Sequence, residues 1–295
     1  MPARILDGTK LAARIQAETA RAVRQLPDGQ PPPTLAAVIV GDSSAARAYA
    51  DSQRRQCQMT GIEYRLQQLP AHTSDQALRA EIERLNVDPR VTGIVLHLPL
   101  PAGIDPAAIQ SCIAPHKDVE GVNPANIGRV FYGQPIVAPC TALAAMALIR
   151  ESAVSICGAE AVIVGHSNIV GKPLAILLVN ELATVSLCHV ATRHLASHTR
   201  RADILVVAVG KPRLISAEMV KPGAVVIDVG INRVAAPDEN GQACQRLVGD
   251  VDFEAVSAVA RAITPVPGGV GPVTTAMLLR NTVQAAQQQA VGRRF

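Results

Sequence analysis

Residues 161–173 read AVIVGHSNIVGKP, an apolar run followed by a loop with two glycines and then by a lysine–proline pair. Four consecutive apolar residues at 161–164 predict a buried strand of a parallel sheet. Gly165 and Gly171 would let the backbone approach a ligand closely, and Pro173 is tolerated in the first turn of a helix. A helix N-terminus after such a strand presents free N–H groups to an anion. The pattern therefore predicts a pyrophosphate site, although its spacing differs from GxGxxG and a tight turn without a ligand is the alternative.

Two further apolar runs downstream also end in glycine. Residues 206–209 precede Gly210, and residues 227–229 precede Gly230. Ligands of open α/β sheets bind beyond the carboxyl ends of the strands. Three glycine-bearing strand ends at one edge of a sheet favour a bound dinucleotide over an empty turn. They add Gly210 and Ile231 to the candidate cofactor-binding residues.

Helical and strand-like segments alternate over the rest of the chain as well. Before residue 100, the sequence predicts helices at 9–26, 43–60 and 74–85 and strands at 35–40, 62–66 and 93–97. After residue 140, it predicts helices at 143–151, 172–182 and 274–289 and strands at 161–164, 184–188, 204–207 and 224–228. This order is typical of two doubly wound α/β domains, the second of Rossmann type. We expect the domains to comprise residues 1–118 with 273–295, and residues 119–272.

The composition of the 295-residue chain argues against several kinds of partner. The formal charge is only +4, tryptophan is absent and aromatic residues make up 2%, so stacking platforms for single-stranded nucleic acid are hard to build. No apolar run reaches the length of a membrane span, and no apolar signal segment is visible. Six widely spaced cysteines, without a CxxC pair or histidines at ligand spacing, predict free thiols and no metal. We therefore expect a cytoplasmic protein that binds neither nucleic acid nor membranes.

The chain resembles the methylenetetrahydrofolate dehydrogenase/methenyltetrahydrofolate cyclohydrolase family in segments spread over nearly its whole length. The segments are VIVGD at 38–42, HLPLP at 97–101, KDVEG at 117–121, PCT at 139–141, GHSNIVGKP at 165–173, KPG at 221–223, IDVG at 227–230, GDV at 249–251 and TPVPGGVGP at 264–272. The resemblance implies two domains that flank a folate cleft, the first folate-binding and catalytic and the second binding NADP or NAD. It also implies a homodimer. The implied reaction oxidises 5,10-methylenetetrahydrofolate to the methenyl form, commonly with hydrolysis to 10-formyltetrahydrofolate.

The resemblance also points to individual site residues, three of which depart from the family pattern. Tyr49 stands where the family has a tyrosine that packs against folate. Gln53 stands where the family has a lysine that assists proton transfer, and since it lies four residues after Tyr49 it should face the same cleft. His97 replaces a glutamine that contacts the lysine, and Glu120 replaces the aspartate that holds the pterin. The other implied substrate contacts are Leu98, Pro99, Pro267, Gly268 and Gly269.

The three substitutions fall on one constellation, which favours a retuned or partly disabled centre. Hydride transfer needs aligned reactants and no strong protein base, whereas hydrolysis needs water activation and proton movement. A glutamine amide does not exchange a proton usefully near neutral pH, so Gln53 should spare the dehydrogenase more than the cyclohydrolase. His97 is either a hydrogen-bonded structural residue or a substitute acid/base. Glu120 is either the pterin anchor or a solvated loop acid.

The cofactor side departs from the family pattern too. His166 stands in place of the usual arginine beside the ribose phosphate of NADP, and Val190 in place of a serine. The loss of charge and hydrogen bonding predicts a weakened NADP preference with possible use of NAD, unless Arg193 compensates. The implied cofactor-binding residues are Gly165, His166, Ser167, Ile169, Gly171, Pro173, Val190, Gly210 and Ile231. Tyr64 is interpreted as a core or loop residue.

Two other functions stay open from the sequence. A divergent paralogue could act on another folate-like substrate through the altered centre. A non-catalytic relative could bind folate or dinucleotide and regulate a partner. Retention of Tyr49 and of the loop at 165–173 argues against the second, because a scaffold need not keep both ligand surfaces.

Overall fold

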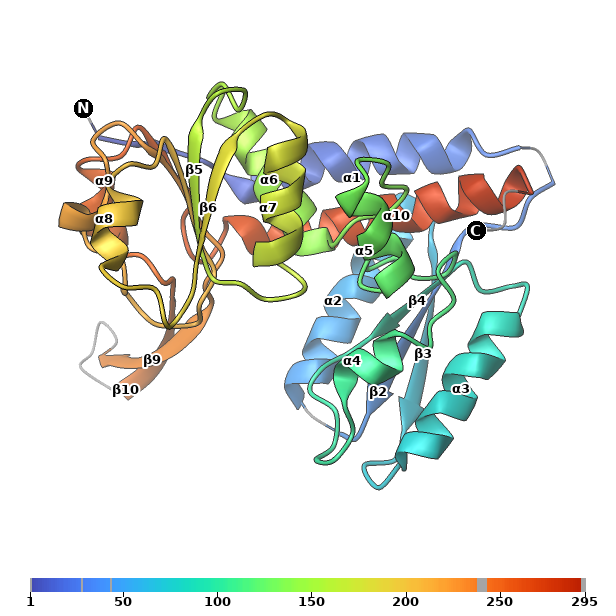
Figure 1. Ribbon diagram of the computed structural model, residues 1–295. Helices are drawn as coiled ribbons and strands as arrows, with labels where there is room; N and C mark the ends of the chain where they lie inside the picture. Colours follow the sequence, from blue (N-terminus) through green and yellow to red (C-terminus); the bar gives the residue numbers. More distant parts are fainter. Residues whose placement is uncertain (1, 28, 43, 238–242, 293–295) are drawn as a thin grey trace. The chain divides into compact units, whose positions relative to one another are not determined.

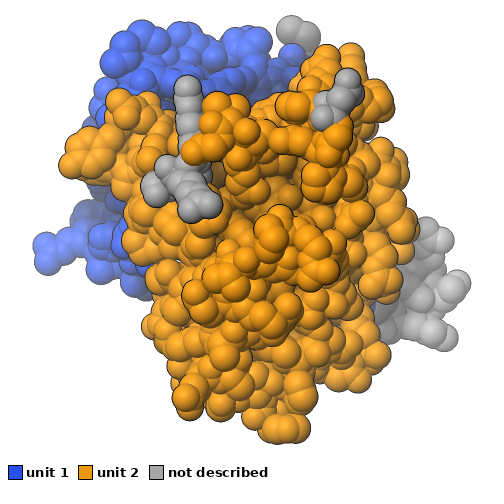
Figure 2. Space-filling model, turned by 90° about the vertical axis from the view of Figure 1, so that its right-hand side faces the viewer, with its two compact units in different colours: residues 1–12, 141–274 blue, residues 13–140, 275–295 orange. Residues whose placement is uncertain are grey.

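The computed structural model describes residues 2–27, 29–42, 44–237 and 243–292 (Figure 1). The chain divides into two compact units, unit 1 with residues 1–12 and 141–274 and unit 2 with residues 13–140 and 275–295 (Figure 2). Each unit contains a parallel sheet with helices connecting the strands. The predicted α/β fold class is therefore confirmed.

The division differs from the expected one at its boundaries. Residues 1–12 belong to unit 1 because β1 (Arg4–Ile5) pairs in parallel with β11 (Ala262–Ile263). Residues 119–140 belong to unit 2, where the Asn281 amide donates to the carbonyl oxygens of Val119 and Ala138 at 2.9 and 3.2 Å. These assignments depend on pairings between distant parts of the chain, which local sequence patterns do not reveal.

Unit 1 contains a six-stranded sheet of order β1-β11-β8-β7-β5-β6, in which every neighbouring pair is parallel. The strands not yet given are β5 (Glu160–Val164), β6 (Thr184–Cys188), β7 (Ile204–Val207) and β8 (Val225–Asp228). The helices after residue 139 and before residue 260 are α6 (Cys140–Glu151), α7 (Gly171–Asn180), α8 (Leu195–Thr199) and α9 (Phe253–Ser257), with a 3-10 turn at Ala217–Met219. The central strands β7 and β8 are wholly buried, as expected for parallel strands covered on both faces. The predicted strands of this unit are confirmed to within one residue at each end.

Unit 1 also contains an antiparallel hairpin that the sequence did not predict. Its strands are β9 (Asn232–Pro237) and β10 (Ala243–Val248), with Asn232 opposite Val248. The hairpin follows β8 directly and is separate from the six-stranded sheet. It returns the chain to Gly249 and Asp250, which lie close to the end of β8.

Unit 2 contains a three-stranded parallel sheet of order β3-β2-β4. The strands are β2 (Thr34–Val40), β3 (Glu63–Leu69) and β4 (Gly93–Leu96). The helices that lie wholly or mainly in this unit are α1 (Gly8–Arg24), α2 (Ser44–Thr60), α3 (Asp75–Val87), α4 (Pro106–Gln110), α5 (Pro124–Phe131) and α10 (Val270–Ala290). The central strand β2 is buried at every position, and its Ala36 and Val38 belong to a core cluster with Leu78 and Ile82 of α3.

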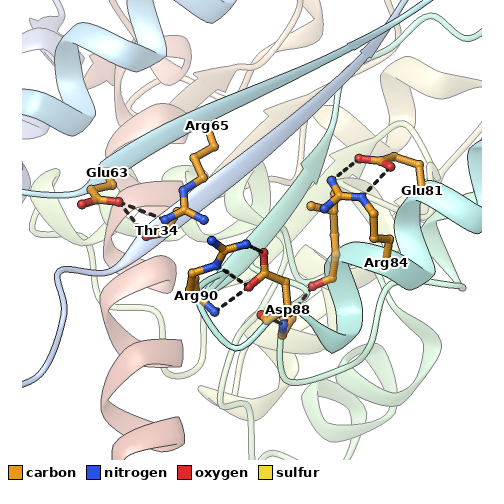
Figure 3. Close-up of polar contacts among 9 residues, drawn as sticks. Thr34, Glu63, Arg65, Glu81, Arg84, Asp88 and Arg90 are labelled. Carbon is orange, nitrogen blue, oxygen red and sulfur yellow. Dashed lines mark hydrogen bonds and ion pairs between the residues drawn. The ribbon is translucent and has the colours of Figure 1, made fainter.

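Charged side chains hold the C-terminal end of α3 (Figure 3). Arg90 donates from Nε and Nη2 to the two carboxylate oxygens of Asp88, both at 3.0 Å, and this hydrogen bonding lowers the pKa of Asp88 to about 2. The Nζ atom of Lys117 donates to the carbonyl oxygens of Leu85 and Asp88 at 2.9 and 2.7 Å. A cation at a helix C-terminus satisfies carbonyls that have no partner within the helix. Lys117, the first residue of the KDVEG segment, therefore stabilises a helix end.

Two properties of the described residues bear on possible partners. None of the helices they form combines the length and the apolar character that crossing a bilayer requires. Within the same ranges, no three histidine, cysteine or acidic side chains gather in a way that could hold a metal ion.

Candidate active site

Gln53 lies at the centre of a buried polar cluster in unit 2. Its side chain projects from α2 and is 1% exposed. Its Oε1 atom lies 3.3 Å from the hydroxyl oxygen of Tyr64 on β3 and 3.1 Å from Nε2 of His97, which follows β4. An amide oxygen only accepts hydrogen bonds, so Tyr64 and His97 both donate to it. The three elements thus meet in an uncharged, hydrogen-bonded centre.

His97 is 6% exposed and packs edge-on against the ring of Tyr49, with ring centroids 5.4 Å apart and planes inclined at 70°. Burial lowers the pKa of His97 to about 4. The imidazole is therefore neutral at pH 7, and its Nε2 carries the hydrogen that Gln53 accepts. These properties favour the hydrogen-bonded structural role of His97 over that of a proton carrier.

Tyr49 presents an aromatic ring at the surface of this cluster. It lies one helical turn before Gln53 on α2 and is 47% exposed. Partial burial raises the pKa of the phenol, while hydrogen bonding to Thr275 and to Gln53 acts in the opposite direction. Leu98 is also exposed, next to His97, and the Leu98–Pro99 peptide bond is cis. An exposed ring and an exposed leucine beside a buried polar centre suit a flat, partly polar ligand.

Glu120 lies half-buried beside the end of β4, where the N–H of Leu96 donates to its Oε2 at 3.4 Å. Burial raises the pKa of Glu120 to about 8, and the nearby Asp118 adds to the rise. The carboxyl group is therefore largely protonated at pH 7. A ligand with N–H donors would bind the ionised form, and its binding would release a proton.

The loop that carries Glu120 is anchored by Asp118. This buried carboxylate accepts hydrogen bonds from the N–H groups of Gly121 and Asn123 and from the side-chain amide of Asn126, all between 2.8 and 2.9 Å. Gly121 has φ +73°, and a Cβ there would lie 2.3 Å from the carbonyl carbon of Ala138. The residues of the KDVEG segment therefore fix the backbone that positions Glu120.

The three remaining candidate substrate residues lie in unit 1. Pro267, Gly268 and Gly269 line a cavity of about 150 Å³ together with residues 228–231, among them the candidate cofactor residue Ile231. The Val266–Pro267 peptide bond is cis. The structure thus groups Tyr49, Leu98, Pro99 and Glu120 in one unit and this Pro-Gly-Gly segment in the other.

A larger cavity in unit 1, of about 490 Å³, lies at the carboxyl ends of β5, β6 and β7. Its lining includes four candidate cofactor residues, Gly165, His166, Ser167 and Val190. Four further candidates are close in sequence to the lining residues but do not line the cavity themselves: Ile169, Gly171, Pro173 and Gly210. Besides the two histidines, the described lining includes the positively charged side chain of Lys211. Such a position at the edge of a parallel sheet suits a dinucleotide.

The loop between β5 and α7 requires glycine at two positions. Gly165 has φ +123°, and a Cβ there would lie 2.2 Å from the carbonyl oxygen of Ala208. A Cβ at Gly171 would lie 1.8 Å from the carbonyl oxygen of Gly165. The Ser167 hydroxyl oxygen accepts from the N–H of Val170, the residue before α7, at 3.1 Å. The glycines thus allow a tight turn that joins the cavity-lining residues 165–167 to the N-terminus of α7, and such a helix start suits an anionic cofactor.

Two histidines stand together at the cavity lining, His166 after β5 and His189 after β6. Their ring centroids are 5.3 Å apart. The Nδ1 atom of His189 accepts from the N–H of Ala191 at 3.2 Å, and the side chain of Val190 is fully exposed. No arginine and no carboxylate belongs to the described lining, and Arg193 does not line it either. The described lining therefore offers two imidazoles and the amine of Lys211 to a ligand.

A buried pair of aspartates holds the loops next to this cavity, and sequence reasoning missed it. Asp228, at the end of β8, accepts from the N–H groups of Gly230, Asp250 and Val251 at 2.9 to 3.0 Å. Asp250 accepts in turn from the N–H groups of Val209 and Gly210 at 2.7 and 3.0 Å, which orients the glycine after β7. Burial raises the pKa of Asp228 to about 6. The two aspartates belong to the IDVG and GDV segments. The resemblance of these segments to the family was therefore the signal in the sequence that could have pointed to the pair.

Comparison with known proteins gives two matching family models. The catalytic-domain model of tetrahydrofolate dehydrogenase/cyclohydrolase matches residues 6–120, and its NAD(P)-binding-domain model matches residues 139–290. The chain belongs to the tetrahydrofolate dehydrogenase/cyclohydrolase family. The expected family and the expected NADP or NAD cofactor are therefore confirmed.

Relatives in this family match the chain from end to end. It is 48% identical to bifunctional protein FolD of Geobacillus thermodenitrificans over 290 residues, which covers 98% of this chain and 99% of the relative. Among solved structures, the NADP and inhibitor complex of the Trypanosoma brucei methylenetetrahydrofolate dehydrogenase-cyclohydrolase is 40% identical, with a TM-score of 0.91 over 98% of this chain and 99% of that one. The bifunctional enzyme of Campylobacter jejuni is 42% identical, with a TM-score of 0.90 over 97% and 99%.

The structure brings into one place the three positions that were expected to depart from the family pattern. Gln53 and His97 are hydrogen-bonded to each other, and Glu120 lies beside the end of the strand that precedes His97. Tyr64 belongs to the same cluster although no motif contains it. The signal for Tyr64 was weak, because its position on β3 relative to α2 follows only from the folded chain.

Proposed function

We propose that this chain oxidises 5,10-methylenetetrahydrofolate to 5,10-methenyltetrahydrofolate with NAD(P)+, and that its methenyltetrahydrofolate cyclohydrolase activity is weak. The observation that carries the proposal is the uncharged cluster around Gln53. Its oxygen is occupied by Tyr64 and His97, and the imidazole is neutral at pH 7. Hydrolysis needs a group that moves protons to and from water, and none of Gln53, Tyr64 and His97 does so at pH 7.

Hydride transfer makes smaller demands on these side chains. Tyr49 and Leu98 offer apolar area for a folate ring system, and Glu120 offers a carboxyl group for the N–H groups of a pterin. These contacts orient the substrate, and orientation alone accounts for much of the rate of a bimolecular step. The nicotinamide supplies the hydride acceptor when the cofactor is bound. Loss of a proton carrier at position 53 therefore costs the dehydrogenase less than the cyclohydrolase.

The decisive experiment measures both half-reactions on purified protein. We expect NAD(P)H and methenyltetrahydrofolate to form from methylenetetrahydrofolate, and methenyltetrahydrofolate to hydrolyse at close to its uncatalysed rate. Rapid release of 10-formyltetrahydrofolate from the methenyl substrate contradicts the proposal. Tight folate binding without turnover identifies the non-catalytic alternative. The absence of both folate binding and turnover identifies a divergent paralogue.

We further propose that the preference for NADP over NAD is weakened. His166 and His189 stand at the ends of β5 and β6, where neither an arginine for a phosphate nor a carboxylate for a ribose hydroxyl lines the described cavity. Michaelis constants for the two cofactors provide the test. A constant for NADP far below that for NAD contradicts this part of the proposal.

A homodimer and a cytoplasmic location complete the proposal. Both come from the resemblance to the family. Sedimentation equilibrium tests the first, because a single species of the monomer mass of 30.9 kDa contradicts it. Fractionation of cells that express the protein tests the second.

A further inference from the structure

Tyr64 holds a defined position between two neighbouring residues of α2. It lies on β3 opposite Leu35 of β2, and its hydroxyl oxygen is 3.3 Å from Oε1 of Gln53. The guanidinium carbon of Arg54 lies 5.9 Å from the centre of the Tyr64 ring, a cation–π distance. Burial raises the pKa of Tyr64 well above its ordinary value, so the hydroxyl keeps its hydrogen throughout the physiological range.

The amide of Gln53 has two chemically different ends. Its oxygen only accepts and its nitrogen only donates, whereas Tyr64 and a neutral His97 can each do either. With the oxygen toward them, Tyr64 donates and His97 carries its hydrogen on Nε2. With the nitrogen toward them, Tyr64 accepts and His97 must carry its hydrogen on Nδ1. A phenol donates more readily than it accepts, because its oxygen lone pair is delocalised into the ring, so Tyr64 favours the first arrangement.

The first arrangement determines which atom faces Tyr49. Tyr49 lies one helical turn before Gln53 on α2, and its ring packs edge-on against that of His97, a partner of the same amide. Since the Gln53 oxygen is occupied by Tyr64 and His97, its nitrogen is the atom left for the Tyr49 hydroxyl. A phenol oxygen that accepts from an amide leaves its own hydrogen for another partner.

We propose that Tyr64 is a positioning residue that, together with His97, holds the Gln53 amide with its nitrogen toward Tyr49, so that the Tyr49 hydroxyl donates to the folate ligand. The last part rests on the proposed function, because it names the ligand. The first part concerns the protein alone and is measurable without substrate.

Substitution of Tyr64 by phenylalanine removes the hydroxyl and little else. The amide of Gln53 is then free to turn, and Tyr49 donates to the Gln53 oxygen in the turned state instead of to the ligand. Loss of one hydrogen bond of ordinary strength should raise KM for methylenetetrahydrofolate about three- to tenfold, while kcat changes less than about twofold. Tyr132→Phe is the matched control, because this tyrosine is 81% exposed and loses the same atom.

The tautomer of His97 reports the orientation of the amide directly. In protein labelled with ¹⁵N-histidine, with the His97 signals assigned by their loss in His97→Gln, we expect the wild-type ring to carry its hydrogen on Nε2. Tyr64→Phe should move a measurable fraction to Nδ1, and Tyr132→Phe should not. In a Gln53→Glu background the side chain has two oxygens and no nitrogen, so Tyr64→Phe should leave the tautomer unchanged.

Three outcomes overturn the proposal. A wild-type His97 with its hydrogen on Nδ1 does so without any variant, which keeps the test valid if Tyr64→Phe fails to fold. An unchanged tautomer in a folded Tyr64→Phe protein does so as well. An equal response in the presence and absence of Gln53 shows a general structural effect. Absence of turnover with the expected tautomers contradicts the proposed function and leaves the positioning role intact.

Discussion

At the scale of single residues, the polar centre of unit 2 is defined by which hydrogens are donated and which are accepted. Gln53 accepts twice, His97 is neutral and Tyr64 keeps its hydrogen. The resemblance and the four-residue spacing led to Tyr49 and Gln53 from the sequence alone. Tyr64 was out of reach, because its contact with α2 requires the register of β3 against β2. The chemical roles of these residues stay predictions.

Replacement of Gln53 by lysine should restore a proton carrier to the centre. We expect methenyltetrahydrofolate hydrolysis to rise about 100-fold or more, which is the usual contribution of general acid–base catalysis. The buried amine should also lower the free energy of unfolding by roughly 1–3 kcal/mol. Rates of hydrolysis and urea unfolding curves provide the two measurements. Gln58→Lys, on the exposed face of the same helix, should change neither, and an inactive but folded Gln53→Lys protein argues that the missing amine is not the limiting defect.

His97 should make the protein sensitive to acid. Its pKa is about 4 in the folded state against 6.5 in the unfolded state, so the unfolded chain binds more protons between these values. The stabilisation from the neutral ring is complete above pH 6.5 and is lost as the pH falls, by up to about 3 kcal/mol near pH 4. Unfolding curves at pH 7 and pH 4.5 should therefore differ less in His97→Gln than in the wild type. Equal pH dependence of the two proteins contradicts this, and the exposed His72→Gln should behave as the wild type.

Cofactor preference should depend on a single side chain at the first glycine loop. His166→Arg places a permanent cation at the cavity lining, where charge-assisted hydrogen bonds to a 2′-phosphate become possible. We expect the Kd for NADP to fall about tenfold, with little change for NAD. Equilibrium binding of both cofactors tests this without turnover. An equal gain for NAD and NADP argues against recognition of the phosphate, and His72→Arg controls for added charge elsewhere.

At the scale of elements, continuous apolar runs allowed accurate prediction and irregular segments did not. The strands β2, β5 and β7 were located to within one residue because each is a buried run bounded by polar or glycine residues. The hairpin of β9 and β10 was missed, since its strands carry mixed polar sequence and are defined by pairing with each other. The stretch at 119–140, expected in the second domain, instead contains α5 and packs within unit 2.

The turn between β5 and α7 should tolerate no side chain at its second glycine. In Gly171→Ala the added Cβ would lie 1.8 Å from the carbonyl oxygen of Gly165, so the loop must shift. We expect cofactor affinity to fall about tenfold or more and unfolding free energy to drop by about 2–4 kcal/mol, as for other overpacked or strained sites. Gly128→Ala is the matched control, because its Cβ meets open space within α5 and should stabilise the helix by about 0.5–1 kcal/mol. Wild-type cofactor binding by Gly171→Ala contradicts the need for glycine there.

At the scale of the whole molecule, the first residues of the chain are structural parts of unit 1. Ile5 and Leu6 adjoin in sequence, but Ile5 is exposed while Leu6 is buried, and the N–H of Leu6 donates to the carbonyl oxygen of Ile263 at 2.8 Å. We expect Leu6→Ala to cost about 2–4 kcal/mol of stability and Ile5→Ala less than about 1 kcal/mol. Hydrogen exchange at Ala262 and Ile263 should accelerate in the first variant only. Equal behaviour of the two variants contradicts the role of β1.

The chain contributes to each unit from two separated stretches, and this has a consequence for its biosynthesis. The polypeptide leaves the ribosome from its N-terminus. Residues 1–12 therefore cannot pair with the strand at 262–263 until that strand has been made, and residues 13–140 cannot pack against α10 until that helix has been made. Unit 1 is incomplete until β11 has been translated, and unit 2 until α10 has been translated. Nascent chains stalled before residue 260 should therefore expose apolar strands and engage chaperones, whereas the released product should fold without them.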